Sequence, residues 1–273
     1  MTNYNTVSTL RNALNRVLFQ IDDRFEVIVV DNHSSDGSLE ILKDFEQRGK
    51  LRLVVEECSR GRGKQVAFEH CKGDVAIFQI DMDDLIKPVL SKVAGEYDNL
   101  FKDRVLHLGT DSTAHLTMVG SHLVGELGGW KDLNWGEDWE FWARAARAGK
   151  YAFASVNLYD NVGDHPERRT LFGSVRHRYT VYHDLLLAGR RVITPDEKSS
   201  LLKRLLVSVA RLRLLGRNRY TDSTHLNFDP YAAQYDFTEL LLKKLHFEVT
   251  NLTYEHSVSS FINDEVDRAG NVD

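Results

Sequence analysis

The chain has 273 residues, of which 42% are hydrophobic and 27% charged, a balance typical of a folded globular protein. Its formal net charge of −5 provides no overall basic field, which argues against nucleic acid as a partner. No apolar run approaches the roughly 20 residues that a membrane-spanning helix needs, and no basic-then-apolar signal segment stands at the N-terminus. Since Cys58 and Cys71 are the only cysteines, we expect a cytoplasmic protein without a disulfide framework.

The first half of the chain alternates between strand-like and helical patterns. Three short apolar runs predict buried strands: 25–30, 51–55 and 74–80. Three stretches have apolar residues at helical spacing: 8–20, 38–48 and 63–71. This alternation indicates a mostly parallel sheet with helices on both faces. Ligands bind such sheets at the carboxyl ends of the strands, where the sequence places acidic turns after residues 30 and 80.

The turn "DMDD" (81–84) gathers Asp81, Asp83 and Asp84 at the end of a predicted strand. Carboxylates this close repel one another unless a cation lies among them, and hard divalent ions such as Mg²⁺ or Mn²⁺ prefer carboxylate oxygens. The same pattern is also typical of a loop in which Asp83 or Asp84 caps the next helix. The residues alone do not decide between a metal site and a helix cap.

Two further segments bring polar groups to the same edge. Asp31 ends its strand, so we expect its carboxylate to point into the crevice and accept a hydrogen bond from a ligand. The basic, glycine-containing stretch "SRGRGKQVA" (59–67) precedes a helix, a position that favours phosphate binding. It lacks the spacing of the P-loop, so a nucleoside triphosphatase is not supported.

The segment "NWGEDWEFW" (134–142) places an acid pair among tryptophans. A helix is predicted from Glu137 to Ala148, with the tryptophans mainly in the core and Glu140 and Arg144 as a surface ion pair. Glu137 and Asp138 are either favourable charges at a helix N-terminus or groups held for chemistry.

The chain after residue 170 has a mainly helical pattern. Thr194 as N-cap and Gly216 as a stop predict one long helix, and 236–246 predicts a shorter one. The long helix carries an apolar stripe that we expect to pack on the rest of the protein, with contact between 198–215 and a membrane surface as the alternative. The stripe consists of Leu201, Leu205, Val209 and Leu212.

The order of these motifs resembles that of the family 2 glycosyltransferases. The resemblance runs from residue 2 to roughly 165 through "TNYN" (2–5), "VVDNHSSDGS" (29–38), "GRGKQVAFEHCKGDVAIFQIDMDD" (61–84) and "GGW…GEDWEFWARAARAG" (128–149). It implies an α/β catalytic domain of GT-A type over 1–169, followed by a mainly helical extension over 170–273. It also implies transfer, with inversion, of a sugar from a UDP-, GDP- or dTDP-sugar to a hydroxyl acceptor (glycan, lipid-linked or small molecule), assisted by Mg²⁺ or Mn²⁺.

The resemblance assigns nucleotide-binding roles to residues of the first half. Tyr4 and Asp31 would line the nucleobase pocket, and Lys64 would lie beside the nucleotide. Asp81 and Asp83 match the family's aspartate pair, which contacts the ribose and the diphosphate-bound metal.

The resemblance assigns the reacting groups to the second half. Asp138, with Glu137 beside it, matches the motif that supplies the general base. His165 and Arg168, in "GDHPERR" (163–169), would help to hold the metal and the diphosphate.

The chain departs from the family pattern at two places. Relatives have an apolar strand directly before the turn matched by "TNYN", whereas Met1 stands there in this chain. We therefore expect that the chain as given starts late and lacks that first strand. Asn32 stands where many relatives have a second aspartate, a change with little expected effect because Asn keeps the hydrogen-bonding shape.

Two other functions are compatible with the sequence. One is a non-catalytic nucleotide-sugar-binding or scaffold protein of the same fold, and the other is a metal-dependent nucleotidyltransferase, which would release inorganic diphosphate. The sequence is also compatible with a homodimer and with a membrane-peripheral position.

Overall fold

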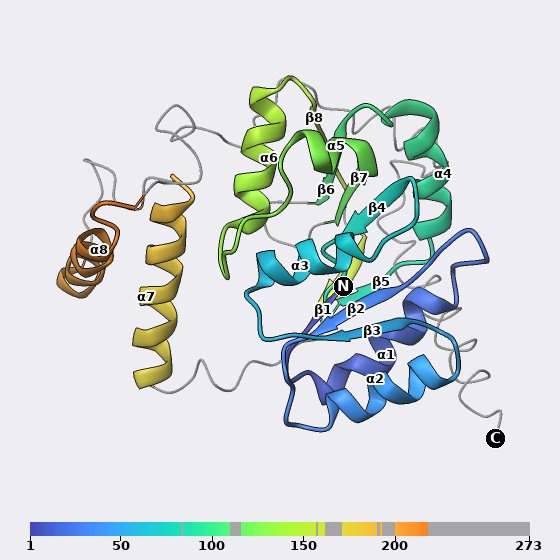
Figure 1. Cartoon of the computed structure of the whole chain (residues 1–273), viewed down its shortest axis with the longest axis horizontal. Coiled ribbons are helices and arrows are strands. Elements are labelled where there is room, and N and C mark those ends of the chain that lie inside the picture. Colours follow the sequence, from blue (N-terminus) through green and yellow to red (C-terminus); the bar gives the residue numbers. More distant parts are fainter. Residues whose placement is uncertain are drawn as a thin grey trace.

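The first part of the chain forms a parallel sheet covered by three helices. The computed structural model describes residues 1–82, 84–109, 116–156, 158–161, 171–189, 192 and 200–217. The strands β1 (Thr2–Asn3), β2 (Ile28–Asp31) and β3 (Arg52–Val55) are parallel, in the order β1-β2-β3. Helices α1 (Val7–Leu18) and α2 (Ser38–Gln47) lie on one face and α3 (Arg60–Glu69) on the other (Figure 1).

Alternation along β2 explains this two-sided cover. Val29 packs against apolar residues of α1 and α2, whereas Ile28 and Val30 pack against Val66 and Ala67 of α3. Because successive side chains of a strand point to opposite faces, an uninterrupted apolar run is buried on both sides. The predicted strands and helices of this region are confirmed.

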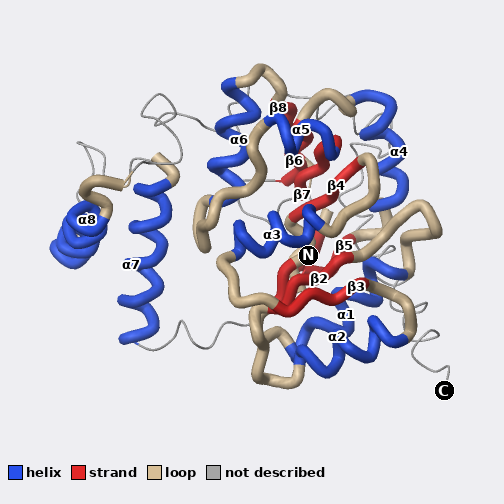
Figure 2. Tube along the Cα trace, in the orientation of Figure 1, coloured by secondary structure: helices blue, strands red, loops and turns tan. Residues whose placement is uncertain are grey.

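A second, mixed sheet carries the middle of the chain. Its order is β4 (Val75–Phe78), β7 (Leu116–Gly120), β6 (Val105–Gly109) and β8 (Tyr151–Ser155). Strand β7 is antiparallel to both β4 and β6, while β8 is parallel to β6. Helix α4 (Leu90–Leu100) covers one face, and α5 (Ser121–Glu126) and α6 (Glu137–Arg147) cover the other (Figure 2). A short antiparallel pair, β5 (Asp84–Ile86) with β9 (Tyr159–Asn161), lies beside α1.

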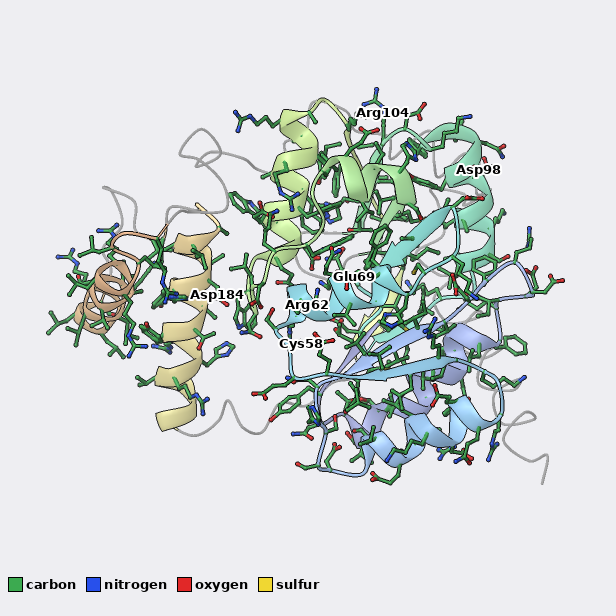
Figure 3. All side chains as sticks on the ribbon, viewed as in Figure 1. Cys58, Arg62, Glu69, Asp98, Arg104 and Asp184 are labelled. Carbon is green, nitrogen blue, oxygen red and sulfur yellow. The ribbon has the colours of Figure 1, made fainter. Side chains whose placement is uncertain are left out.

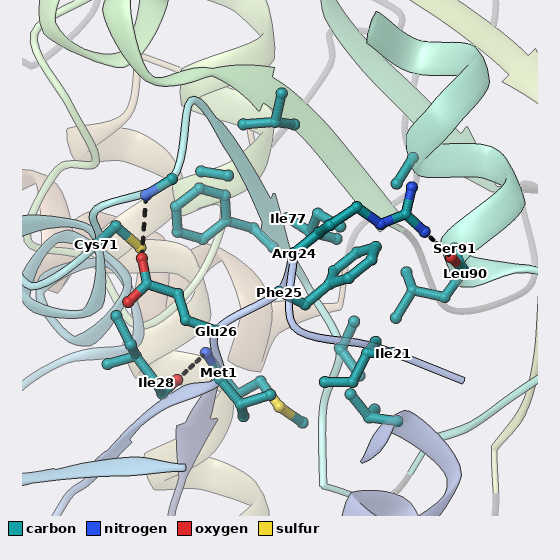
Figure 4. A pocket seen from close by; sticks show the side chains of 18 of the residues that line it. Met1, Ile21, Arg24, Phe25, Glu26, Ile28, Cys71, Ile77, Leu90 and Ser91 are labelled. Atoms are coloured by element: carbon teal, nitrogen blue, oxygen red, sulfur yellow. Dashed lines mark hydrogen bonds between the residues drawn. The ribbon is translucent and has the colours of Figure 1, made fainter. Parts of the chain in front are cut away.

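The two larger sheets share no backbone ladder within the described part of the chain. A cavity of about 480 Å³ lies between them, lined by Met1, Val27 and Ile28 on one side and by β4 on the other (Figure 4). The ammonium group of Met1 donates a hydrogen bond to the Ile28 carbonyl at 2.8 Å, and its burial lowers its pKa to about 6. Thr2 and Asn3, which the sequence predicts as part of a turn, instead form β1.

The described part of the region after residue 170 is helical. Helix α7 (Leu171–Leu187) packs against the start of α6, where Leu187 and Ala188 contact Leu133, Trp139 and Ala143. Asp184 of α7 accepts a hydrogen bond from the backbone N–H of Asn134 at 2.8 Å (Figure 3). No helix in the described ranges is both long enough and apolar enough to cross a membrane.

Helix α8 (Leu201–Arg213) corrects two of our predictions. The helix begins at Leu201, because Ser200 is its N-cap and accepts a hydrogen bond from the Lys203 backbone N–H, so one helix continuous from Thr194 is wrong. Val207 and Ala210 pack on α7, so the predicted apolar stripe does not form the packing face. The predicted helix at 236–246 lies outside the described residues, and the domain boundary at 169/170 stays a prediction.

Gly61 allows α3 to approach the loop before α6. Its backbone N–H donates to the Leu133 carbonyl at 2.8 Å, and a Cβ at this position would lie 1.9 Å from the Lys131 carbonyl oxygen. We expect Gly61→Ala to lower the free energy of unfolding by about 3 kcal/mol, because the backbone must shift to relieve the clash. Urea denaturation measures the change.

Gly95 in α4 provides the matched control, because a Cβ there meets nothing within 4 Å. Gly95→Ala should be neutral or stabilise by up to about 1 kcal/mol, since alanine favours the helix. Equal effects of the two substitutions would contradict the close packing at Gly61.

Candidate active site

Three strands end at one edge of the molecule in strained turns. Among the described residues, the non-glycine positions with positive φ are Asn5 (51°), His33 (51°) and Gln79 (68°). They follow β1, β2 and β4 by one or two residues. Such conformations are costly for side-chain-bearing residues and cluster at ligand sites. The predicted edge is therefore also where the backbone is least relaxed.

Asp31 organises the turns of this edge. It is fully buried and accepts hydrogen bonds from the Asn3 side-chain amide (2.7 Å), the Ser34 backbone N–H (2.9 Å) and the Ser34 hydroxyl (2.7 Å). Its carboxylate thus ties β1 to the turn after β2. Tyr4 lies next to this network and is 60% exposed, so its ring is accessible. The predicted contacts of Asp31 and Tyr4 with a nucleobase stay predictions.

The Lys64 ammonium group lies against the acid pair of α6. Ser59 caps α3 by accepting a hydrogen bond from the Arg62 backbone N–H, and the helix then directs Lys64 inward. Its Nζ donates to Glu137 Oε1 at 2.9 Å and to Asp138 Oδ2 at 2.5 Å. The sequence predicts Lys64 beside a nucleotide but gives no sign of this pairing across more than 70 residues.

The charges of this cluster set the protonation of its members. Burial alone would lower the pKa of Lys64, but the carboxylates of Asp138, Glu137 and Asp81 raise it above its ordinary value. Burial raises the pKa of Glu137 to about 7, and the attraction of Lys64 opposes this rise only in part. The cluster therefore holds a permanent cation and a carboxyl group that titrates near neutral pH.

Asp138 is the more accessible of the two acids. Its side chain is 16% exposed, compared with 7% for Glu137. Trp130 donates its indole N–H to Asp138 Oδ1 at 3.2 Å, an orienting contact that the sequence does not reveal. Both acids lie in the first turn of α6, after Gly136 (φ 74°), where the helix dipole favours negative charge.

The tryptophans of the segment differ in their surroundings. Trp139 and Trp142 are buried as predicted. Trp135 is half-buried, with the Arg60 guanidinium 5.1 Å from its ring centroid and the edge of His177 against it. It therefore stands between α3 and α7 and not in the core.

The predicted ion pair of Glu140 and Arg144 is confirmed, but its predicted position at the surface is wrong. Glu140 is fully buried, and Arg144 is only 16% exposed. Arg144 also donates hydrogen bonds to the carbonyl oxygens of Leu127 and Gly129. The loop after α5 folds over this face of α6 and excludes water from the pair, which the i,i+4 spacing alone does not reveal.

Only part of the predicted metal site lies within the described residues. Asp81 is half-buried and contributes to the electrostatic field at Lys64. Asp83, His165 and Arg168 lie outside the described residues. Within the described ranges, no group of three or more His, Cys, Asp or Glu side chains is placed to hold a metal ion.

Comparison with known proteins gives a match for the first part of the chain. Residues 1–107 match the family described as glycosyl transferase family 2, and we call these residues the family 2 segment. The family 2 segment contains Tyr4, Asp31, Lys64 and Asp81, whereas Glu137 and Asp138 follow it in the sequence.

Curated relatives match the family 2 segment over a limited length. The undecaprenyl-phosphate 4-deoxy-4-formamido-L-arabinose transferase of Edwardsiella ictaluri is 36% identical over 81 residues, which are 27% of this chain and 25% of that protein. The matched region thus spans about a quarter of the length of such relatives.

Solved structures show that the fold of the family 2 segment continues through the described chain. TarS 1–349 of S. aureus in complex with UDP-GlcNAc superposes with a TM-score of 0.51 at 20% identity, covering 80% of this chain and 72% of that one. The mannosyltransferase PcManGT of Pyrobaculum calidifontis, in complex with GDP-Man and Mn²⁺, gives a TM-score of 0.53 at 15% identity, covering 100% and 86%. Both are glycosyltransferases of GT-A type, so the predicted fold class is confirmed.

The raised pKa of Glu137 predicts a pH-dependent effect of its amide variant. Between about pH 4.5 and pH 7, the native protein keeps the Glu137 proton, whereas the unfolded chain has lost it. The contribution of Glu137 to the free energy of unfolding is therefore greatest below pH 4.5 and is lost as the pH rises through 7. Glu137→Gln cannot ionise. We therefore expect it to gain on the order of 2 kcal/mol of unfolding free energy relative to wild type between pH 5 and pH 8.

Urea denaturation at the two pH values tests this expectation. Glu40→Gln, at an exposed position of α2, serves as the control and should show the same small difference at both. A pH-independent effect of Glu137→Gln would show that Glu137 does not hold the proton.

Proposed function

We propose that the protein transfers a sugar, with inversion, from a nucleotide-diphosphate sugar to an acceptor hydroxyl, with Asp138 as the general base. The observation that carries the proposal is the orientation of a partly accessible Asp138 carboxylate by Lys64 and Trp130 at the start of α6. The match of residues 1–107 to glycosyl transferase family 2 supports the reaction class. The nucleotide-sugar complexes of TarS and PcManGT support the donor class, while the base of the nucleotide stays open among UDP, GDP and dTDP.

The geometry of Asp138 suits a general base. Its two oxygens have about four lone-pair directions, of which Lys64 and Trp130 take one each. The remaining lone pairs are able to take the proton of the acceptor hydroxyl. The hydroxyl oxygen then attacks the anomeric carbon of the donor sugar, and the bond from that carbon to the diphosphate breaks. Lys64 holds the carboxylate in place, and Glu137 beside it shares that cation.

The leaving diphosphate needs positive charge on the other side of the sugar. Asp81 has the hard oxygen ligands that Mg²⁺ and Mn²⁺ prefer, and the sequence places Asp83 and His165 as its partners. Such an ion, when bound, would neutralise charge that develops on the diphosphate. Arg168 is the side chain that we propose to assist it, and Tyr4 and Asp31 are proposed for the nucleobase end.

The acceptor is proposed only as a class. The Edwardsiella relative is named for undecaprenyl phosphate, which is a lipid phosphate. This similarity favours a lipid-linked acceptor over a free sugar. A cytoplasmic location and a homodimer stay predictions from the sequence.

The donor can be identified by thermal shift. A ligand that binds only the native state raises the melting temperature. We expect one of UDP-, GDP- or dTDP-sugars, added with Mn²⁺, to stabilise the protein, and less so in EDTA. No shift with any of them would contradict donor binding.

Asp138→Asn then separates catalysis from binding. We expect transfer or donor hydrolysis to fall at least about 100-fold, because the amide cannot accept the proton, while the donor-induced thermal shift is retained. Glu40→Gln is the control and should keep full activity. Equal rates in Asp138→Asn and wild type would show that Asp138 is not the general base. Release of inorganic diphosphate instead of a nucleoside diphosphate would favour a nucleotidyltransferase. Donor binding without turnover in wild type would favour the non-catalytic alternative.

A further inference from the structure

Helix α8 has two apolar faces, and the part of the chain that the structure describes covers only one of them. Val207 and Ala210 are buried against Leu186 of α7, with Tyr179 and Tyr182 around them. This inner face fixes the helix on α7, at the end of the molecule farthest from the two large sheets (Figure 1).

The outer face carries the apolar stripe that the sequence predicted as core. Leu201 is 84% exposed, Leu205 58% and Leu212 66%, and Val209 is also exposed. With about 100° of rotation per residue, these positions fall within roughly 80° of one another, opposite Ala210. Leu215, just beyond the helix, is 74% exposed as well. Exposed leucines in one row indicate a surface that something apolar covers.

Within residues 201–217, the charged side chains beside the stripe are all basic. Residues 201–217 contain no Asp or Glu and five basic residues: Lys203, Arg204, Arg211, Arg213 and Arg217. At helical spacing, Arg204 and Arg211 border the stripe on one side and Arg213 on the other. Lys203 and Arg213 also lie over the rings of Tyr182 and Tyr179, at 6.0 Å and 5.6 Å, and so help to anchor α8 on α7.

We propose that the outer face of α8 binds the surface of an anionic phospholipid bilayer. The leucines would enter the boundary between headgroups and acyl chains, and the arginines beside them would meet lipid phosphates. A helix of 13 residues is about 20 Å long, which is too short to span the bilayer core but suits a position in its plane. The surface is separate from the proposed active site, so this proposal does not depend on the proposed reaction.

The charge favours lipid over a second copy of the chain. A symmetric dimer through this face would bring two sets of arginines together without acidic partners from α8, which costs free energy. An anionic bilayer instead offers an apolar environment to the leucines and phosphate groups to the arginines.

Sedimentation of the 273-residue chain with vesicles tests the proposal. We expect it to pellet with vesicles that contain phosphatidylglycerol and to bind at least tenfold more weakly to pure phosphatidylcholine. Raising NaCl from 50 to 500 mM should weaken binding to the anionic vesicles, because salt screens the headgroup attraction. Absence of binding, or equal binding to both lipids, would overturn the proposal.

Matched variants separate the two contributions. Leu205→Ser with Leu212→Ser should reduce binding at least tenfold, and Arg204→Gln with Arg211→Gln should do the same on anionic vesicles only. Phe19→Ser removes an apolar residue that is 52% exposed next to α1, and it should leave binding unchanged. Wild-type binding by the leucine variant would count against the stripe as the contact.

Two measurements without lipid decide between the remaining occupants. We expect the leucine variant to keep the melting temperature and the mass in solution of wild type. A change from dimer to monomer by light scattering would assign the stripe to a second copy instead. A clear fall in melting temperature would assign it to another part of the same chain.

Discussion

The buried ammonium group of Lys64 is the interaction on which the arrangement of the site depends. It belongs to α3, which covers the first sheet, and its two carboxylate partners belong to α6, which covers the second. Removal of one partner from a buried ion pair typically costs about 3–5 kcal/mol, because a charge is left without compensation. Here the ammonium group contacts two acids, so it also reduces the repulsion between the neighbouring carboxyl groups of Glu137 and Asp138. Gly61, one turn earlier on α3, brings the backbone near enough for this contact.

The seam between the two sheets explains why the polar groups gather there. The sheets share no ladder among the described residues, so their strand ends and the loop before α6 meet through side chains. On one side, Asp31 accepts hydrogen bonds from the turn after β2 and from β1. On the other side, Arg144 donates a hydrogen bond to the loop after α5 and so holds that loop in place. The partly accessible carboxylate of Asp138 accepts one hydrogen bond at each oxygen, from Lys64 and from Trp130, and so keeps lone pairs for a further donor.

The sequence predicts the elements better than the pairings between them. Apolar runs such as 25–30 and 74–80 identify strands because a strand buried on both faces leaves no polar alternation. The Lys64 contact, the indole of Trp130 on Asp138 and the burial of Glu140 depend on segments brought together only by the fold. In α8, periodicity shows an apolar stripe but not which of two apolar faces packs, and the smaller Val207 and Ala210 allow the closer approach to α7.

The separation of the two sheets also bears on how the chain acquires its native state. The first sheet closes within residues 2–55, and the second within residues 75–155, so each ladder can form from its own stretch of chain. The contact of Lys64 with the acids needs both halves to be in place, since its partners are 73 and 74 residues away. Loop-closure entropy delays such long-range contacts relative to local ones. We therefore expect the contact of Lys64 with Glu137 and Asp138 to form late in folding, after the strands and helices on both sides of it.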